Sequence, residues 1–166
     1  MTLIAWDEYD VVSTEPDDYI QWYHDGHDYR AFQRAALAQV LATLSDGQSI
    51  PHPVLHYDLH ATHHIIFDAP LGRCHHETGQ YIDNMIHIDI PLDVSLCRRL
   101  LRDFKNSSIT KEDILKEIQF YLDHARPLFF DADLKESADL VVNGLLPPEQ
   151  ASETVRNYLS TTQYCT

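Results

Sequence analysis

The sequence predicts an α/β fold in which a parallel sheet is flanked by helices. Short apolar segments rich in β-branched residues alternate along the chain with stretches whose apolar residues recur every four positions. Strands that alternate with helices in this way pair in parallel, because each helix returns the chain to the same end of the sheet. The 166 residues are 44% hydrophobic and 23% charged. That length and composition suit one core, so we expect residues 1–166 to form a single domain.

Four short apolar segments are expected to form the strands: Leu3–Trp6, His63–Asp68, Met85–Ile90 and Leu140–Val142. Each of them stops at a residue type that ends strands. The first meets an acidic cluster, the second and third meet a proline, and the last meets Asn143-Gly144. The order of these segments along the chain places helices between most of them.

Four further segments have a helical pattern: Ala31–Leu44, Val94–Phe104, Ile114–His124 and Glu149–Leu159. In the first, the apolar residues that lie four apart are Phe32, Ala36, Val40 and Leu44. Asp46-Gly47 then ends that helix. Thr110 followed by Asp113 is typical of a helix N-cap, so the third helix is expected to start close to this pair.

The charge balance excludes several classes of partner. Twelve basic residues against 26 acidic residues give a formal net charge of −14, which repels nucleic acid and anionic membranes. No apolar run reaches the roughly 18 residues of a membrane helix, and the first residues lack a basic and apolar leader. We therefore expect a cytoplasmic protein. The cysteines Cys74, Cys97 and Cys165 are odd in number and irregular in spacing, which argues against a disulfide framework.

Acidic residues gather at the start of the chain and at the expected strand ends. The first 30 residues hold eight acidic residues and one basic residue, Arg30. Asp7 follows the first strand and Asp68 ends the second. Ligands of α/β sheets bind at the carboxyl ends of strands, so a carboxylate there is placed to accept a hydroxyl proton or to position a metal-bound water. The alternative is that these acids cap the following loop or helix, within a solvated acidic surface.

The chain contains 11 histidines, several of them close together in sequence. A helix would bring four of them onto one face: His56, His60, His63 and His64. Imidazole and the thiolate of the Cys74-His75-His76 run are zinc ligands. However, prolines and an expected strand interrupt the segment, and a strand sends alternate side chains to opposite faces. A zinc site is therefore the less favoured interpretation.

Basic residues gather on the helix that follows the third strand. Arg98, Arg99 and Arg102 lie three and four residues apart, so their side chains are neighbours on the helix surface. Guanidinium groups in this arrangement can bind phosphate oxygens through paired hydrogen bonds. The alternative is an ion pair with Asp93 or Asp103 of the same helix.

Taken together, these segments resemble the uridine kinase branch of the P-loop nucleoside kinases. Four stretches carry the resemblance in the family's order: Trp6–Asp10, Val54–Asp58, His87–Asp103, and Ala125–Phe129 with Ser137–Val142. The second resembles the family's P-x-Y-D segment. The third resembles its F-V-D-x-x-x-D-x-R-L-x-R-R-x-x-R-D strand and lid helix, and the last resembles its V-R-P-M helix and Y-A-D-V-I-I strand.

The resemblance implies transfer of the γ-phosphoryl group of ATP to a hydroxyl of a nucleoside-like small molecule, with Mg²⁺ as the metal. By the same resemblance, Asp7 would take the proton from the acceptor hydroxyl. Residues expected to contact the acceptor are Tyr9, Asp28, Tyr57 and Arg126. Arg30 falls in the region that holds the sugar in the family, where an acidic residue is expected.

The resemblance also assigns the phosphate side of the site. Asp68 would hold Mg²⁺ through a water molecule, and residues about 92–136 would form a lid-like helical region. Arg98, Arg99 and Arg102 would stabilise the charge on the transferring phosphoryl group. The family's lid continues with Arg-Gly-Arg, whereas residues 104–108 here read Phe-Lys-Asn-Ser-Ser, so the acceptor is expected to differ from uridine.

The largest departure from the family concerns its phosphate-binding loop. None of the five glycines forms a G-x-x-x-x-G-K-[ST] loop here, and none of the four lysines follows a glycine. We therefore expect weak or no kinase activity from these residues. The family's strand that leads into this loop lies between those matching 63–68 and 85–90, so its absence would expose two strand edges or force them together. Three interpretations remain open. The first is a kinase fragment. The second is a non-catalytic pseudokinase-like binding or interaction protein, with a homodimer formed through these edges as one form of it, and the third is a subunit whose partner supplies the strand.

Overall fold

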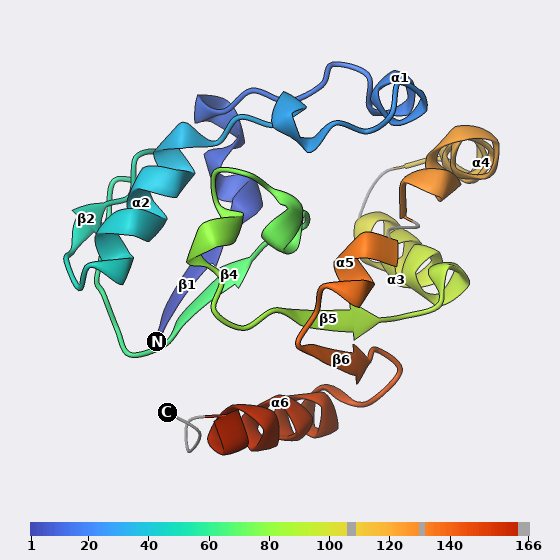
Figure 1. Cartoon of the computed structure of the whole chain (residues 1–166). Helices are drawn as coiled ribbons and strands as arrows, with labels where there is room; N and C mark the ends of the chain where they lie inside the picture. The colour runs from blue at the N-terminus through green and yellow to red at the C-terminus, as the bar shows by residue number, and fades with distance from the viewer. Residues whose placement is uncertain (106–108, 130–131, 163–166) are drawn as a thin grey trace. The chain divides into compact units, whose positions relative to one another are not determined.

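A computed structural model of the 166-residue chain is shown in Figure 1. The structure describes residues 1–105, 109–129 and 132–162. The chain separates into two compact units, Met1–Met85 and Ile86–Thr166. Cys165 and lid positions 106–108 lie outside the described residues.

A pair of parallel strands lies at the centre of Met1–Met85. Strand β1 (Thr2–Ala5) pairs with β4 (Ile65–Asp68), and the register runs from Thr2 opposite Ile65 to Ala5 opposite Asp68. Both strands confirm the expected segments, with shifted ends. Trp6 was expected in the first strand, but it begins the 3-10 helix η1 (Trp6–Val12).

A second strand pair in this unit was not expected. Strand β2 (Ile50–Pro51) pairs with β3 (Asp58–Leu59) in antiparallel orientation. Two residues are too few to show the alternating pattern from which strands are predicted, which explains why the sequence did not reveal the pair. The connecting loop turns at His56, which has a positive φ of 57°.

The helix expected from Ala31 to Leu44 begins four residues later, because tertiary contacts hold its first residues outside the helix. Helix α2 covers Ala35–Ser45. Gln33 forms a bridge with Thr14, and the backbone N–H of Arg34 donates a hydrogen bond to Glu77. Phe32 therefore lies outside the helix, although it is buried. The expected end of the helix at Asp46-Gly47 is confirmed.

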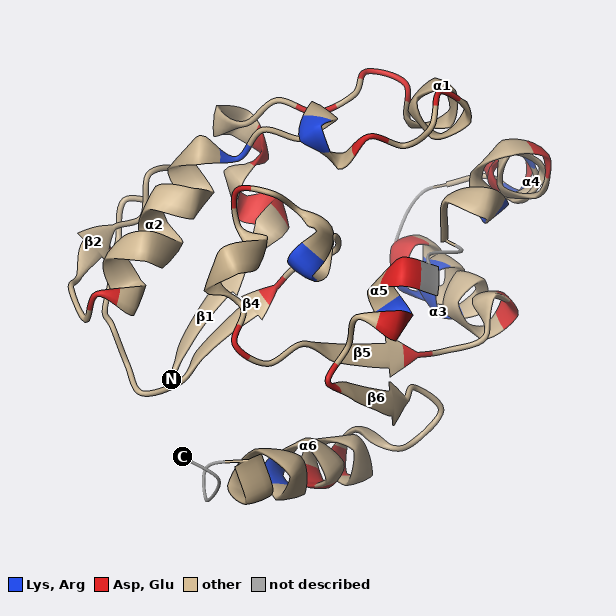
Figure 2. Ribbon diagram, viewed as in Figure 1, with Lys and Arg blue, Asp and Glu red and all other residues tan. Residues whose placement is uncertain are grey.

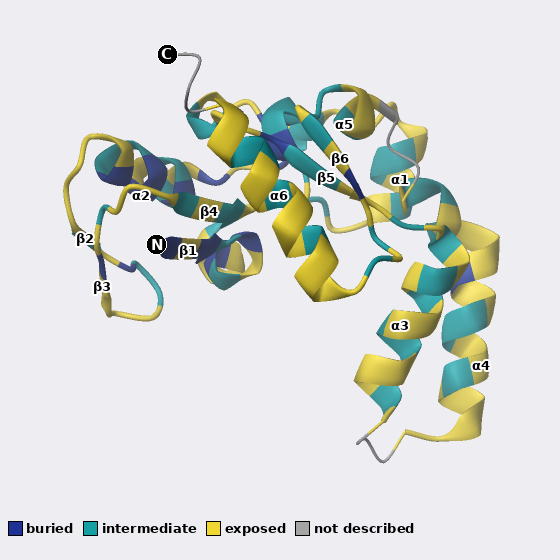
Figure 3. Ribbon diagram, turned by 90° about the horizontal axis from the view of Figure 1, so that it is seen from below, coloured by how far each residue is buried: buried dark blue, intermediate teal, exposed yellow. Residues whose placement is uncertain are grey.

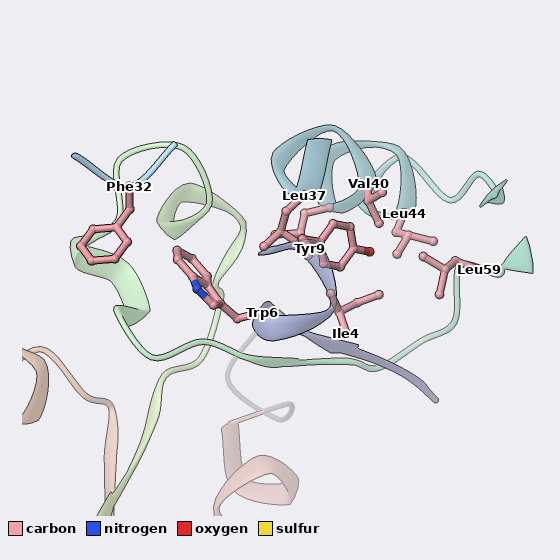
Figure 4. Packing of buried hydrophobic residues seen from close by; sticks show 9 residues of the cluster. Ile4, Trp6, Tyr9, Phe32, Leu37, Val40, Leu44 and Leu59 are labelled. Atoms are coloured by element: carbon pink, nitrogen blue, oxygen red, sulfur yellow. The ribbon is translucent and has the colours of Figure 1, made fainter. Parts of the chain in front are cut away.

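The core of this unit packs α2 and η1 against the strands. Figure 4 shows Trp6 and Phe32 facing each other at one end of the cluster. Its buried members are Ile4, Trp6, Tyr9, Phe32, Leu37, Val40, Leu41, Leu44 and Leu59. The buried residues of α2 are spaced three, one and three apart, as one face of a helix requires. The shorter helices of the unit are α1 (Tyr19–His24) and the 3-10 turns η2 (Tyr29–Ala31), η3 (Gly72–Cys74) and η4 (Gly79–Tyr81).

The second unit, Ile86–Thr166, contains its own pair of parallel strands. Strand β5 (Ile86–Asp89) pairs with β6 (Leu140–Asn143), and Asp89 lies opposite Asn143. Both expected strands are confirmed. Gly144 follows β6 where a side chain would not fit, because a Cβ atom would lie 2.9 Å from Cβ of Ile90 and 3.1 Å from the Asp89 carbonyl oxygen.

Helices make up most of this unit. The α-helices are α3 (Leu92–Phe104), α4 (Lys111–Phe120), α5 (Ala132–Glu136) and α6 (Pro148–Thr162). After α4 the chain continues through the π-helical turn η5 (Tyr121–Ala125) and the 3-10 turn η6 (Arg126–Phe129). Thr110 and Asp113 form a reciprocal capping box at the start of α4, which confirms the expected N-cap. Figure 3 shows α3 and α4 side by side, with exposed residues along both.

The two parallel pairs and the helices that accompany them confirm an α/β fold, and they are compatible with the P-loop kinase-like fold that the sequence resembles. Each helix in the described part of the chain falls short of the length and apolar character that crossing a bilayer requires.

Candidate functional site

Two exposed carboxylates lie at the carboxyl edge of the β1–β4 pair. Asp7 stands two residues beyond the end of β1, and Asp68 is the last residue of β4, opposite Ala5. Because the strands are parallel, both residues belong to the same edge of the sheet. Neither carboxylate has an ion-pair partner among the described residues. This edge therefore presents negatively charged acceptors to solvent, as the sequence predicted.

A polar cluster of Glu8, Tyr9, His52 and Tyr57 lies beside Asp7, and we call it the Glu8–His52 cluster. The rings of Tyr9 and Tyr57 both contact the His52 ring, at centroid distances of 4.6 and 5.2 Å. His52 Nε2 lies 3.4 Å from Glu8 Oε2. His52 and Tyr9 are fully buried, whereas Tyr57 is exposed. The cluster thus links η1 to the β2–β3 loop.

Both tyrosines of this cluster are held in the protonated form. Burial raises the pKa of Tyr9 far above its usual range, and the negative charge of Glu8 and the neighbouring Tyr57 raise it further. Burial and Glu8 also raise the pKa of Tyr57. Each hydroxyl therefore keeps its proton and can donate a hydrogen bond.

Figure 2 shows the acidic residues of the chain in red. Several of those near the start of the chain form contacts within the fold. Arg34 is 1% exposed and forms ion pairs of 2.8 Å with Asp10 and with Glu15. Its guanidinium also lies 4.5 Å from the centre of the Trp6 ring. Asp18 caps α1 by accepting hydrogen bonds from two backbone N–H groups. Asp18 thus confirms the alternative that these acids act as caps, whereas the sequence did not predict the pairing of Asp10 and Glu15 with a buried arginine.

Asp28 is engaged by its neighbour Arg30. The guanidinium contacts both carboxylate oxygens at 2.7–3.0 Å, and the Arg30 backbone N–H donates to the same carboxylate. These hydrogen bonds lower the pKa of Asp28 to about 2. The position where the resemblance expects an acceptor-binding acid therefore carries a carboxylate that is already paired.

The histidines do not assemble a metal centre in the part of the chain that the structure describes, where no three side chains of metal-ligating type come together. His75 is buried and fully used: Nε2 lies 2.9 Å from the Phe32 carbonyl oxygen, and Nδ1 lies 2.8 Å from the Thr78 hydroxyl. Burial lowers the pKa of His75, so its imidazole is neutral. Its burial had no signal in the sequence, because it depends on contacts across 43 residues.

The three arginines of α3 each have a partner within their own unit. Arg98 donates to the Gly144 carbonyl oxygen at 2.9 Å, Arg99 pairs with Glu117 of α4, and Arg102 lies 2.8 Å from Asp103. The alternative of an intrahelical ion pair is thus correct for Arg102. A guanidinium has five N–H donors, so each arginine retains donors for an anion.

The carboxyl edge of the β5–β6 pair also ends in polar residues. Asp89 ends β5 and binds Lys135 at 2.7 Å, which lowers the pKa of Asp89. Arg126 is exposed at the start of η6. The resemblance placed Asp89 within a matched stretch without assigning it a role.

Comparison with known proteins identifies uridine kinases as relatives of this chain. The uridine kinase of Psychromonas ingrahamii is 30% identical over 125 aligned residues, and that of Shewanella amazonensis is 29% identical over the same length. Each alignment covers 68% of this chain and 58% of the relative, so the chain spans less than two thirds of their length. No family model matches the chain. The similarity supports a distant uridine kinase-like relationship.

Proposed function

We propose that this chain is a nucleoside-kinase-like protein whose first unit binds a nucleoside or a similar small hydroxyl compound. The observation that carries the proposal is Asp7, an exposed carboxylate without an ion-pair partner among the described residues, two residues beyond the end of a parallel strand. An unpaired carboxylate at a strand end can accept a hydrogen bond from a hydroxyl, and later its proton. The similarity to uridine kinases supports a nucleoside as that hydroxyl compound.

In this proposal the residues of Met1–Met85 contact the acceptor. Asp7 is the general base, Tyr57 borders the acceptor, and Asp28 contributes through its paired carboxylate. Tyr9, which the resemblance also assigns to the acceptor, is fully buried and supports η1 from the core instead. For Arg126, in Ile86–Thr166, an acceptor contact stays a prediction from the resemblance. Arg98, Arg99 and Arg102 provide positive charge for a phosphoryl group with the N–H donors that their present partners leave unused.

ATP and Mg²⁺ are the cofactors that a kinase function brings with it. Asp68 fits Mg²⁺, because this ion is commonly held by one or two carboxylates, waters and substrate phosphates. The phosphates of ATP fit less well, since the 166 residues contain no glycine-rich loop ending in lysine. We therefore assign no step to ATP, and the proposed chemistry of these residues is acceptor binding and proton acceptance.

Calorimetric titration with uridine and 5′-deoxyuridine tests the role of Asp7. We expect Asp7→Asn to weaken uridine binding about tenfold, because a hydrogen bond to a charged group contributes about 1.5 kcal/mol or more. The binding of 5′-deoxyuridine, which lacks the hydroxyl, should not change.

Asp46→Asn is the matched control, because Asp46 is an exposed acid at the end of α2. It should bind uridine as the wild type does. Absence of uridine binding by the wild type, or equal affinity of Asp7→Asn and wild type, would refute the proposal.

A further inference from the structure

The Glu8–His52 cluster contains two buried polar atoms without a hydrogen-bond partner in the described part of the chain: the hydroxyl oxygen of Tyr9 and Nε2 of His52. Both side chains are 0% exposed. Buried polar atoms are rarely left without a partner, because water can no longer compensate them. Two such atoms in one small cluster therefore require an explanation.

The hydrogen bonds of the other ring nitrogen determine where the proton of His52 lies. The backbone N–H groups of Val54 and Leu55 donate to Nδ1 at 3.2 and 3.1 Å. Nδ1 is therefore the acceptor of a neutral ring, and the proton is on Nε2. The unpartnered atom of His52 is thus an N–H donor with a fixed direction.

The Glu8 carboxylate lies close to this donor, although the two groups form no hydrogen bond in the structure. The distance of 3.4 Å between His52 Nε2 and Glu8 Oε2 is only slightly beyond the usual range of an N–H···O hydrogen bond. Hydrogen bonds at active sites are often long without ligand and shorten when ligand binds. The contact between Glu8 and His52 thus joins η1 to the β2–β3 loop.

The direction of Glu8 determines the direction of Asp7, because both belong to one 3-10 helix. Side chains three residues apart in such a helix eclipse each other, so Trp6 and Tyr9 share a face, and both are buried. Consecutive side chains are about 120° apart. When Trp6 and Tyr9 point into the core and Glu8 points at His52, Asp7 is left on the remaining, exposed side.

We infer that His52 is a positioning residue: the close approach of its buried Nε2 to the Glu8 carboxylate holds η1 so that the Asp7 carboxylate points outward from the carboxyl edge of β1 and β4. This inference rests on the proposed role of Asp7 as base. A merely structural pair would affect only the stability of the unit. A positioning pair also controls the order of Asp7 and the affinity for a ligand hydroxyl.

Two variants separate these roles. His52→Asn retains a side-chain oxygen that can accept from Val54 and Leu55 but loses the donor to Glu8, and Glu8→Ala removes the acceptor. By ¹⁵N relaxation, we expect the order parameter of the Asp7 amide to fall from about 0.85 toward 0.6 in both variants. The Leu41 amide of α2 should keep its value. If His52→Asn does not fold, Glu8→Ala carries the test, because Glu8 is only partly buried.

The matched control is His56→Asn in the same loop. His56 is exposed and has a positive φ, a conformation that asparagine tolerates well. This variant should leave the order parameter of Asp7 unchanged. If the order parameter of Asp7 falls as much in His56→Asn as in His52→Asn, the inference is overturned, because the effect then belongs to the loop as a whole.

Titration with the two nucleosides tests whether the effect passes through Asp7. We expect His52→Asn to bind uridine three- to tenfold more weakly and 5′-deoxyuridine as well as the wild type does. Equal losses for both nucleosides, or an unchanged order parameter at Asp7, would overturn the inference. A further outcome is that the order parameter of the Asp7 amide falls in the variants while the wild type binds no uridine. The link from His52 to Asp7 is then supported, and the proposed function fails.

Discussion

The two units hold their polar side chains in different ways. In Met1–Met85, a buried aromatic core fixes the backbone next to Asp7, because Trp6 and Tyr9 on either side of it are packed. In Ile86–Thr166, helices α3, α4 and α6 contain no buried residue where they are described, and surface contacts hold the arginines. Packing is insensitive to salt, whereas exposed ion pairs are weak and screened. Substitutions should therefore have larger effects in the first unit.

We expect the largest difference in stability between the units when a leucine is replaced by alanine once in each of them. Leu37→Ala in α2 removes a fully buried side chain, and it should lower the free energy of unfolding of the first unit by about 2–5 kcal/mol. Leu101→Ala in α3 removes a side chain that is 70% exposed, and it should change stability by less than about 0.5 kcal/mol.

Urea unfolding can separate the two units in this experiment. Both tryptophans, Trp6 and Trp22, lie in Met1–Met85, so their fluorescence reports on that unit, while circular dichroism reports on both. Equal losses of stability for the two leucine variants would contradict the contrast between the units.

A smaller effect is expected from the cap of α4. Thr110→Ala removes the capping box and leaves backbone N–H groups of the first turn without an acceptor. This should destabilise the helix by about 1 kcal/mol and speed hydrogen exchange of its amides about fivefold. The control is Thr154→Ala in α6, whose hydroxyl only donates to the Gln150 carbonyl oxygen within the helix. Unchanged exchange in Thr110→Ala would show that the cap contributes nothing to α4.

The smallest effect on stability is expected from Arg30 and Asp28, which are both exposed. Since folding lowers the pKa of Asp28, the pair stabilises the fold above the ordinary pKa of 3.8, and this contribution disappears as the pH falls toward 2. In a carboxyl ¹³C titration, Asp28 should titrate at about 2. Arg30→Gln should move the midpoint toward 3.8, whereas Arg156→Gln in α6 should leave it unchanged. A midpoint that does not respond to Arg30→Gln would mean that the ion pair is absent in solution.

The parts of the fold that could be predicted from sequence are those that depend on nearby residues. The strands at Ile65–Asp68 and Ile86–Asp89 follow from short apolar runs that end before a proline. The start of α4 follows from Thr110 and Asp113, because a capping box is made within four residues. Helix α2 was placed correctly at its end but not at its start, since Arg34 is drawn into contacts with Glu77 and Asp10.

The candidate site also contains some residues whose positions could be predicted from sequence and others whose positions could not. The positions of Asp7 and Asp68 at one sheet edge could be predicted, because the carboxyl ends of parallel strands always lie together. The roles of Glu8 and His52 could not, because these residues are 44 positions apart and meet only when the β2–β3 loop packs on η1. In the sequence, His52 is one of 11 histidines, and no local pattern distinguishes it from the others.

By itself, the sequence determined the alternation of strands and helices, the acidic character of the first 30 residues and the resemblance to uridine kinases. All three depend on residue order or composition, which need no knowledge of long-range contacts. Only the tertiary structure decided which acidic side chains form ion pairs. Asp10, Glu15 and Asp28 are paired with arginines, whereas Asp7 has no ion-pair partner in the described residues. The reason is physical: an ion pair needs two side chains to meet in space, and burial of Arg34 against Trp6 selects which carboxylates it meets.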